Sequence, residues 1–249
     1  MIKGGFNMAI ALIFAGGAGK RMNSRIRPKQ FLELNGKAII IHTLEYFERH
    51  EEIESIAVVC IADWIDYFKN LLKKNFITKV KWVVPGGLTG QESIYNGLKI
   101  ICTDCKESEK EIILIHDGVR PLISEKLITD SIKCVKKYGS AITISSASET
   151  VITVEDEEVV CINNRDVCKI AKAPQSFILS NIVEAHHRAI NDGINNMTDS
   201  ATLMNHYNYR LHTLEGPSEN IKITTPADFY IFRAIFEARE NSQILGITE

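Results

Sequence analysis

The sequence predicts an α/β protein in which an open, mostly parallel and twisted sheet lies between two layers of helices (α/β/α), with a protruding β-arm. Runs of β-branched and apolar residues alternate with amphipathic, helix-length segments from the N-terminus to about residue 145. Such alternation is typical of βαβ crossovers, which build a parallel sheet. Most of the apolar runs are nearly uninterrupted, as expected of parallel strands that are buried on both faces.

The first part of the chain supplies the strands and helices of this sheet in order. Strands are expected at Ala9–Phe14, Ile56–Ile61, Val80–Val84, Ile112–Ile115 and Ala141–Ser145. Between them, apolar residues at helical spacing predict helices over Ala38–His50, Trp64–Asn75, Gln91–Ile101 and Glu125–Tyr138.

The pattern changes after about residue 148. Two short apolar runs, Thr150–Val154 and Val159–Asn163, flank the acidic turn Glu155–Glu158 and predict a β-hairpin. Further on we expect helices at Ser180–Asp192 and Ser200–Tyr207, strands near Tyr209–Leu214 and at Asn220–Ile223, and a helix from Pro226 to about Glu240. No linker or repeat divides the chain, so residues 1–249 are interpreted as one domain with residues 148–168 as an inserted arm.

Composition excludes several classes of protein. The chain has 249 residues, 45% of them hydrophobic and 24% charged, and a formal net charge of −2. These values are typical of a soluble globular protein rather than a disordered, collagenous or coiled-coil chain. A near-neutral charge argues against nucleic-acid binding. No apolar stretch has the length of a membrane span, and no signal-peptide pattern is present. With cysteines scattered in apolar runs, a cytoplasmic protein with reduced thiols is expected.

Some reactive residues are expected to carry no chemistry. The pair Cys102 and Cys105 has the spacing of a redox or zinc motif, but no second pair completes a site, which favours a helix end. His186 and His187 are adjacent on a predicted helix and point in different directions, so solvated helix residues are the favoured interpretation. His116 is interpreted as structural.

The strongest functional signal is a glycine-rich segment at the end of the first predicted strand. It reads Phe14–Met22 (FAGGAGKRM) and is followed by Pro28–Phe31 (PKQF). In open α/β sheets, ligands bind beyond the carboxyl ends of the strands. Glycines there let the backbone approach a ligand, and the exposed N–H groups can bind phosphate oxygens. The spacing matches neither a P-loop nor the dinucleotide fingerprint.

Two cations follow this glycine loop closely. Arg21 and Lys29 both lie within a dozen residues of it and could converge on one triphosphate. The alternative is a flexible turn followed by a solvated basic surface. The succession of strand end, AGG, GKRM and PKQ favours a functional site.

These segments resemble the nucleotidyltransferases that couple CTP to a sugar-alcohol phosphate, a family that includes the 2-C-methyl-D-erythritol 4-phosphate and the ribitol-5-phosphate cytidylyltransferases. The resemblance continues in order through Gly86-Gly87 with Ser93, His116–Pro121 (HDGVRP), Ala173-Pro174-Gln175, Thr198-Asp199 and Glu219–Thr224 (ENIKIT), and spans Ala9 to about Ala238. It implies a Rossmann-like fold of the nucleotide-diphospho-sugar transferase type and a homodimer.

The resemblance also implies roles for individual residues. Arg21, Lys29 and Lys222 would be catalytic and contact the reacting phosphates. The nucleotide would be bound by Ala15, Gly16, Gly17, Gly19, Gly86, Gly87, Ser93 and Asp117, and the acceptor by Thr150, Arg165, Thr198 and Thr224, with Thr150 and Arg165 serving the neighbouring subunit's site. Asp117 would also hold Mg²⁺; pairing with Arg120 is the alternative. Many members carry an arginine where this chain has Gly90.

The expected reaction is therefore transfer of a cytidylyl group from CTP to a polyol phosphate. The segments HDGVRP, KAPQSF and ETVI look closer to the branch that uses D-ribitol 5-phosphate for cell-envelope or capsule polymers, with 2-C-methyl-D-erythritol 4-phosphate as the second choice. A non-catalytic nucleotide-binding regulatory protein is an alternative, which the presence of both Arg21 and Lys29 disfavours. A dehydrogenase would use Asp63 beyond the second strand, but the glycine spacing disfavours it.

Overall fold

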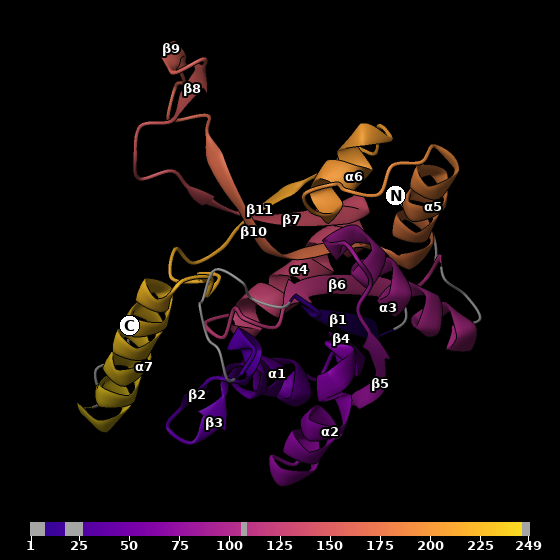
Figure 1. Ribbon diagram of the computed structural model, residues 1–249, viewed down its shortest axis with the longest axis vertical. Coiled ribbons are helices and arrows are strands. Elements are labelled where there is room, and N and C mark those ends of the chain that lie inside the picture. The colour runs from indigo at the N-terminus through magenta and orange to yellow at the C-terminus, as the bar shows by residue number, and fades with distance from the viewer. Residues whose placement is uncertain (1–7, 18–26, 106–108, 246–249) are drawn as a thin grey trace.

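The computed structural model describes residues 8–17, 27–105 and 109–245 (Figure 1). Its centre is a seven-stranded sheet in the order β11-β7-β10-β6-β1-β4-β5. The strands are β1 (Ala9–Ala15), β4 (Ile53–Cys60), β5 (Val80–Pro85), β6 (Ile112–Asp117), β7 (Ser140–Ser146), β10 (Lys169–Ile178) and β11 (Thr213–Glu215). Only β10 runs antiparallel to its neighbours β6 and β7. The predicted mostly parallel α/β sheet is thus confirmed.

Helices cover both faces of the sheet. Because successive side chains of a strand point to opposite faces, Ala11 and Ile13 of β1 pack with α1 (Ile39–Arg49), α2 (Ile65–Lys74) and α4 (Glu125–Tyr138). Ile10 and Leu12 pack instead with α3 (Gly90–Asp104), α5 (Leu179–Asn191) and α6 (Ser200–His206). Each fully buried Leu or Ile contributes about 1.5–3 kcal/mol. The helix layers on both faces of the sheet therefore explain why its strands are apolar at nearly every position.

Close packing of α3 on the sheet depends on Gly97. A Cβ atom at this position would lie 2.4 Å from Cδ1 of Leu12 and 2.9 Å from Cγ2 of the stiff, β-branched Val59. We expect Gly97→Val to lower the free energy of unfolding by about 1–3 kcal/mol through overpacking, measured by urea denaturation. Gly90→Ala at the start of the same helix, where a Cβ meets nothing within 4 Å, is the control and should change stability by less than about 0.5 kcal/mol. Equal stability of both variants would contradict this packing.

Smaller elements complete the body. A 3₁₀ turn, η2 (Lys29–Phe31), leads into the hairpin of β2 (Glu33–Leu34) and β3 (Lys37–Ala38), and a second turn, η3 (Ala62–Trp64), precedes α2. The last helix, α7 (Pro226–Leu245), packs through Phe232 on a separate apolar cluster that contains Val119 and Ile223. This cluster anchors the segment before α7 to the loop that follows β6.

The predicted hairpin is present and projects from the body (Figure 1). Its strands are β8 (Ile152–Glu155) and β9 (Glu158–Ile162), which lie within the range expected for the arm. All their residues are exposed. The exposed apolar side chains are Ile152, Val154, Val159, Val160 and Ile162.

The structure differs from the expected strands at three places. Strand β10 was not expected, because Lys172, Pro174 and Gln175 interrupt its apolar pattern, and the pairing register shifts between Ala171 and Gln175. The strand near Tyr209–Leu214 is the shorter β11. Asn220–Ile223 forms no strand. Its backbone hydrogen bonds instead reach a loop, with the Ile223 N–H donating to Val119 O at 2.9 Å.

The short hairpin of β2 and β3 was not predicted either, whereas the remaining helices and strands lie close to their expected ranges. Cys105 caps the end of α3, which confirms the helix end predicted for the cysteine pair. All six cysteines are free thiols. Among the described residues, no helix combines the length and the apolar character that a membrane crossing requires.

Candidate active site

The candidate site lies where the order of the strands reverses. From β1 the chain proceeds to β4 and β5 on one side and later to β6 on the other, so the carboxyl ends of β1 and β6 flank a topological switch point. The ends of both strands are tied together there, since the Gly118 N–H donates to Phe14 O at 2.9 Å. Ala15 and Asp117 end these strands, which places two of the predicted site residues side by side.

Two glycine segments meet at this edge. A Cβ atom on Gly16 would lie 3.4 Å from Cα of Gly86, and one on Gly86 would lie 3.2 Å from Oγ of Ser93. The Ser93 hydroxyl accepts from the Gly87 N–H at 2.9 Å and donates to Thr89 O at 2.8 Å. The structure thus brings together the predicted nucleotide-binding residues of both loops. Gly17 follows Gly16 directly, whereas Gly19 and Arg21 lie outside the described residues.

The PKQF segment supports the glycine loop. Lys29 Nζ donates to Ile223 O at 2.9 Å, and Gln30 Nε2 donates to Ala15 O at 2.7 Å. Gln30 is buried although it is polar, so its amide is positioned by the core and in turn positions the loop. Sequence reasoning assigned no role to Gln30. Its place in the PKQF motif was the only signal for one.

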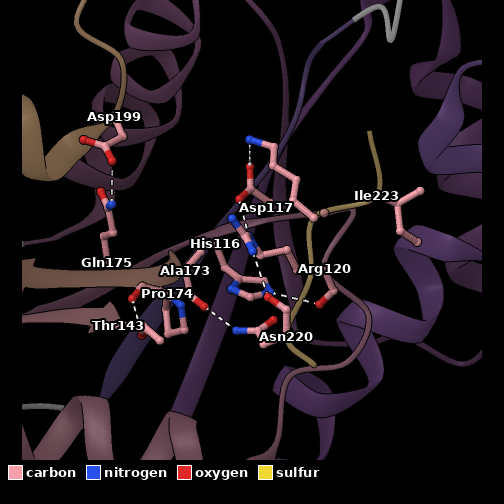
Figure 2. Close-up of polar contacts among 12 residues, drawn as sticks. His116, Asp117, Arg120, Thr143, Ala173, Pro174, Gln175, Asp199, Asn220 and Ile223 are labelled. Carbon is pink, nitrogen blue, oxygen red and sulfur yellow. Dashed lines mark hydrogen bonds and ion pairs between the residues drawn. The ribbon is translucent and has the colours of Figure 1, made fainter. Parts of the chain in front are cut away.

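Asp117 lies at the centre of a charged cluster (Figure 2). Its Oδ1 is 2.7 Å from Lys222 Nζ, and its Oδ2 accepts from Arg120 Nε at 2.8 Å. Burial by itself raises the pKa of the Asp117 carboxyl, but the charges and hydrogen bonds of Lys222 and Arg120 outweigh burial and hold this pKa well below its usual range. Asp117 is therefore charged at neutral pH, and the pairing with Arg120 that the sequence left as an alternative is present.

An irregular segment, residues 219–224, carries Lys222 to this cluster. Arg120 Nη1 donates to Asn220 O at 2.8 Å, and Asn220 Nδ2 donates to Ala173 O at 2.6 Å (Figure 2). The buried side chain of Asn220 thus bridges the segment to β10. Lys222 was expected on a strand, and the structure instead holds it by these side-chain contacts. Neither Arg120 nor Asn220 was predicted as a site residue. Arg120 was named only as the alternative partner of Asp117, and the contacts that both residues make with distant segments leave no signal in local sequence patterns.

A cavity of about 210 Å³ opens beside the cluster. Its lining includes Asp117, Arg120 and Lys222, and also Lys172 of β10 and the predicted acceptor residue Thr198. Burial and, secondarily, the nearby Arg120 charge lower the pKa of the Lys172 ammonium, which donates to Ser218 O at 2.6 Å. The cavity therefore combines three cations and one carboxylate in this part of its wall.

The other end of the cavity is polar and has no lysine or arginine among its described lining residues. Gln175 Nε2 donates to Asp199 Oδ2 at 2.9 Å (Figure 2), and Asp199 caps α6 through the Thr202 N–H at 2.8 Å. His186 and Ser200 also line the cavity. His186 is buried, which corrects the expectation of a solvated histidine; the pattern of α5 places it on the sheet-facing side with Ile182 and Ala189. His187 is exposed as expected.

The remaining predicted acceptor residues lie elsewhere in this chain. Thr150 is exposed at the start of the arm, and Arg165 Nη1 donates to Ser148 O at 3.4 Å. The N–H and hydroxyl of Thr224 both donate to Asp228 Oδ2 at 2.8 Å, at the beginning of α7. None of the three lines the cavity beside Asp117.

Mg²⁺ fits this site only together with a substrate. Within the described ranges, no group of three or more His, Cys, Asp or Glu side chains could hold a metal ion. Asp117 offers one carboxylate beside the glycine loops. Mg²⁺ often binds through one or two carboxylates, substrate phosphates and water rather than through a complete protein cage. The donor set therefore fits a magnesium ion that arrives with a nucleotide.

Comparisons with known proteins agree with this arrangement. The family model described as IspD: 2-C-methyl-D-erythritol 4-phosphate cytidylyltransferase matches residues 9–238. The ribitol-5-phosphate cytidylyltransferase of Streptococcus agalactiae serotype III is 51% identical over 241 residues, which are 96% of this chain and 100% of that relative. The 2-C-methyl-D-erythritol 4-phosphate cytidylyltransferase of Clostridium botulinum type F is 37% identical and covers 91% of this chain and 96% of its own.

A solved structure shares the fold over nearly the whole chain. The crystal structure of 4-diphosphocytidyl-2C-methyl-D-erythritol synthase from Anaerococcus prevotii aligns with a TM-score of 0.80 at 29% identity. The alignment covers 93% of this chain and 96% of that one.

Proposed function

Because the chain belongs to the 2-C-methyl-D-erythritol 4-phosphate cytidylyltransferase family of nucleotidyltransferases, we propose that it joins CTP to D-ribitol 5-phosphate to give CDP-ribitol and pyrophosphate. The acceptor rests on one observation: the relatives named for ribitol 5-phosphate reach 51% identity, against 37% for those named for 2-C-methyl-D-erythritol 4-phosphate. The second acceptor is therefore the alternative.

The reaction brings two anions together. A phosphate oxygen of the acceptor attacks the α-phosphorus of CTP in line, a new P–O bond forms, and the bond to the β-phosphate oxygen breaks with release of pyrophosphate. The attacking oxygen is already charged near neutral pH, so no general base is needed. Two unit charges 4 Å apart repel by about 4 kcal/mol at an effective dielectric constant of 20. The protein must chiefly offset this repulsion.

The cations at the strand ends are suited to that task. Lys222 forms an ion pair with Asp117, and Lys29 donates a hydrogen bond to the backbone of Ile223, the next residue after Lys222. Two ammonium groups are thus held on one segment beside the glycine loop, and we propose that Arg21 joins them. Fixed cations at this position stabilise the charge that develops in the transition state.

The two glycine segments would bind the nucleotide. In this proposal the backbone of Ala15, Gly16, Gly17 and Gly19 holds the triphosphate, and Gly86, Gly87 and Ser93 receive the base. A Cβ atom on Gly16 or Gly86 would already contact the other glycine at 3.4 Å, so the two loops approach closely. Mg²⁺ bound with the phosphates near Asp117 would neutralise part of their charge.

We also propose a homodimer formed through the arm. The hairpin exposes apolar side chains on an isolated two-stranded sheet, which is at best marginally stable in water without further packing. In a dimer, Thr150 and Arg165 at the base of the arm would contact the acceptor phosphate in the partner subunit's site. Because the cysteines are free thiols, we place the protein in the cytoplasm.

The dimer proposal predicts the effect of a charge on the arm. We expect Ile162→Asp, at a position that is 70% exposed, to convert the dimer to a monomer because burying an unpaired charge in an apolar contact is costly. Sedimentation velocity measures the change, and pyrophosphate release should fall with it. Ile190→Asp on α5, which is also exposed, is the control. A wild-type monomer, or a dimeric Ile162→Asp variant, would contradict the proposal.

The central test is a pyrophosphate-release assay. CTP is offered with D-ribitol 5-phosphate and with 2-C-methyl-D-erythritol 4-phosphate in separate reactions, with MgCl₂ and with excess EDTA. We expect the highest kcat/KM for D-ribitol 5-phosphate and loss of turnover in EDTA. Preference for the other acceptor would replace the proposed substrate. Calorimetric binding of CTP without turnover on either acceptor would favour a non-catalytic regulatory protein.

A further inference from the structure

We propose that His186 and Ser200 bind hydroxyl groups of the acceptor's polyol chain and thereby help to select the acceptor. This inference rests on the proposed function, since it assigns the end of the cavity without lysine or arginine to the polyol and the cationic end to the reacting phosphate. Neither residue has a role in the expectations from sequence.

Both side chains contain a buried polar atom whose hydrogen-bonding capacity is not satisfied. Among the residues that the structure describes, His186 Nε2 and Ser200 Oγ are buried and have no hydrogen-bond partner. The two residues are only 2% and 3% exposed, and both line the cavity that contains Asp117 and Lys222. A buried polar group without a partner costs about 1–3 kcal/mol. A ligand hydroxyl that enters the cavity would remove this cost at two points.

The two groups come from elements that hold them in place. The His186 ring stacks on Tyr95 of α3 with ring centroids 5.5 Å apart and planes 18° from parallel. Ser200 begins α6, whose start is fixed by the Asp199 cap and by Gln175 Oε1, which accepts from the Ala201 N–H at 2.8 Å. The two polar atoms themselves are covered in this structure, so a ligand hydroxyl would meet them after side-chain rotations of the kind that are common on binding.

The chemistry of the pair suits a hydroxyl group and not a phosphate. Burial and, to a lesser degree, the neighbouring His187 lower the pKa of the His186 imidazole to about 4. His186 is therefore neutral at physiological pH and offers one nitrogen that donates and one that accepts. The serine hydroxyl can also do both. The cations of the cavity lie instead at Arg120, Lys172 and Lys222.

His186 borders a second hollow besides the cavity that contains Asp117. The histidine lines this open hollow with Tyr95, Asn96 and Lys99. Ser200 distinguishes the two spaces, because it lines the cavity beside Asp117 and does not line the second hollow. If both substitutions change acceptor binding in the same way, the cavity is the site.

The two candidate acceptors differ in their number of hydroxyl groups, which is the feature that His186 and Ser200 would recognise. Ribitol is an unbranched polyol with one more free hydroxyl than 2-C-methylerythritol, which carries a methyl branch instead. A site built to hydrogen-bond a substrate hydroxyl rejects the analogue that lacks it, because its own polar groups then stay unpaired. His186 and Ser200 would therefore favour the acceptor with more hydroxyl groups.

The test compares four variants with the wild type in the pyrophosphate-release assay. We expect His186→Leu to raise the KM for D-ribitol 5-phosphate by about 10- to 100-fold, to lower its advantage over 2-C-methyl-D-erythritol 4-phosphate, and to leave the KM for CTP unchanged. Ser200→Ala should act in the same direction. His186→Gln, which retains a polar nitrogen at a similar distance from the backbone, should restore most of the affinity.

The control variant is His187→Leu. His187 is the adjacent residue, is exposed, and also contacts the Tyr95 ring, at 5.7 Å between centroids. The His187→Leu variant should leave the kinetics with the acceptor unchanged. His186→Leu should unfold at the same temperature as the wild type or higher, since it replaces an unpaired polar group with an apolar one. A merely structural role of His186 predicts the opposite combination, with lower stability and unchanged discrimination.

Several results would overturn the assignment. The assignment is overturned if the wild type is active and His186→Leu leaves the KM for the acceptor unchanged. It is also overturned if Ser200→Ala does not share the effect of His186→Leu, or if His187→Leu reproduces that effect. A direct readout separates this inference from the proposed function. D-ribitol 5-phosphate should shift the His186 imidazole resonances, identified by their absence in His186→Gln, whether or not turnover occurs. An inactive wild type that still shows this shift overturns the catalytic proposal alone, and absence of the shift overturns the assignment.

Discussion

Replacing Lys222 with methionine is expected to reduce kcat/KM for cytidylyl transfer by about 10²–10³-fold. The ammonium group is held 2.7 Å from Asp117 at the carboxyl edge of the sheet, beside the loops that would hold the nucleotide. Its removal leaves the repulsion between the attacking phosphate and the α-phosphate less compensated. Methionine keeps most of the apolar stem, so the loss reports the charge. The pyrophosphate-release assay at saturating CTP measures it.

Lys136 provides a matched control for this substitution. Its Nζ pairs with Glu52 at 2.9 Å, and its side chain is 39% exposed, the same fraction as that of Lys222. Lys136→Met removes an exposed ion pair from α4, on the helix layer opposite α3 and α5. Such pairs contribute only about 0–1 kcal/mol. A Lys222→Met variant as active as Lys136→Met would remove Lys222 from the catalytic assignment.

Replacing Asp117 with asparagine should have an effect of similar size, about 10²-fold or more in kcat. The carboxylate orients both Lys222 and Arg120 and is the proposed contact of the nucleotide-bound Mg²⁺. Asparagine keeps the shape but leaves two cations without their counter-charge. We also expect a higher Mg²⁺ concentration for half-maximal rate. Asp104→Asn is the control, since Asp104 also holds two donors, Lys81 Nζ at 3.0 Å and Trp82 Nε1 at 3.1 Å.

The same substitution has a pH signature. The folded-state pKa of Asp117 is depressed, so its contribution to stability is fully present above its unfolded pKa of about 4 and is lost as the pH falls below that value. The difference in unfolding free energy between the wild type and Asp117→Asn should therefore be constant above about pH 5 and shrink on acidification. Urea denaturation at several pH values measures it. A difference independent of pH would show that the ion pairs do not stabilise the fold.

Local sequence patterns predicted most of the fold correctly. Uninterrupted apolar runs such as Ile56–Ile61 became central parallel strands, because burial on both faces requires apolar residues at every position. Amphipathic segments became the helices on either side. The arm was also predicted, since an apolar alternation around an acidic turn is a short-range signal. Where polar residues and a proline interrupt the pattern, as in β10, the same reasoning failed.

The candidate site was also predicted from the sequence only in part. Glycine loops and a strand-terminal carboxylate indicated the carboxyl edge of the sheet, and the roles of Lys29, Lys222 and Asp117 stay predictions that the variants above test. Gln30, Arg120 and Asn220 were missed. Gln30 and Asn220 bond to other segments, as when Asn220 reaches Ala173 of β10, and Arg120 joins the nearby Asp117 to the distant backbone of Asn220. The acceptor roles of Thr150 and Arg165 stay predictions, because they depend on the proposed dimer.

Residue type and spacing alone determined the layered architecture, the edge at which chemistry should occur and the family resemblance, because all three depend on neighbours along the chain. Tertiary structure decided which charges pair, how Lys222 reaches Asp117 without a strand to carry it, and that the buried His186 lines the same cavity as Ser200. The physical reason is that a hydrogen bond or an ion pair acts over a few ångströms in space, and only the folded chain brings residues from distant segments within that range.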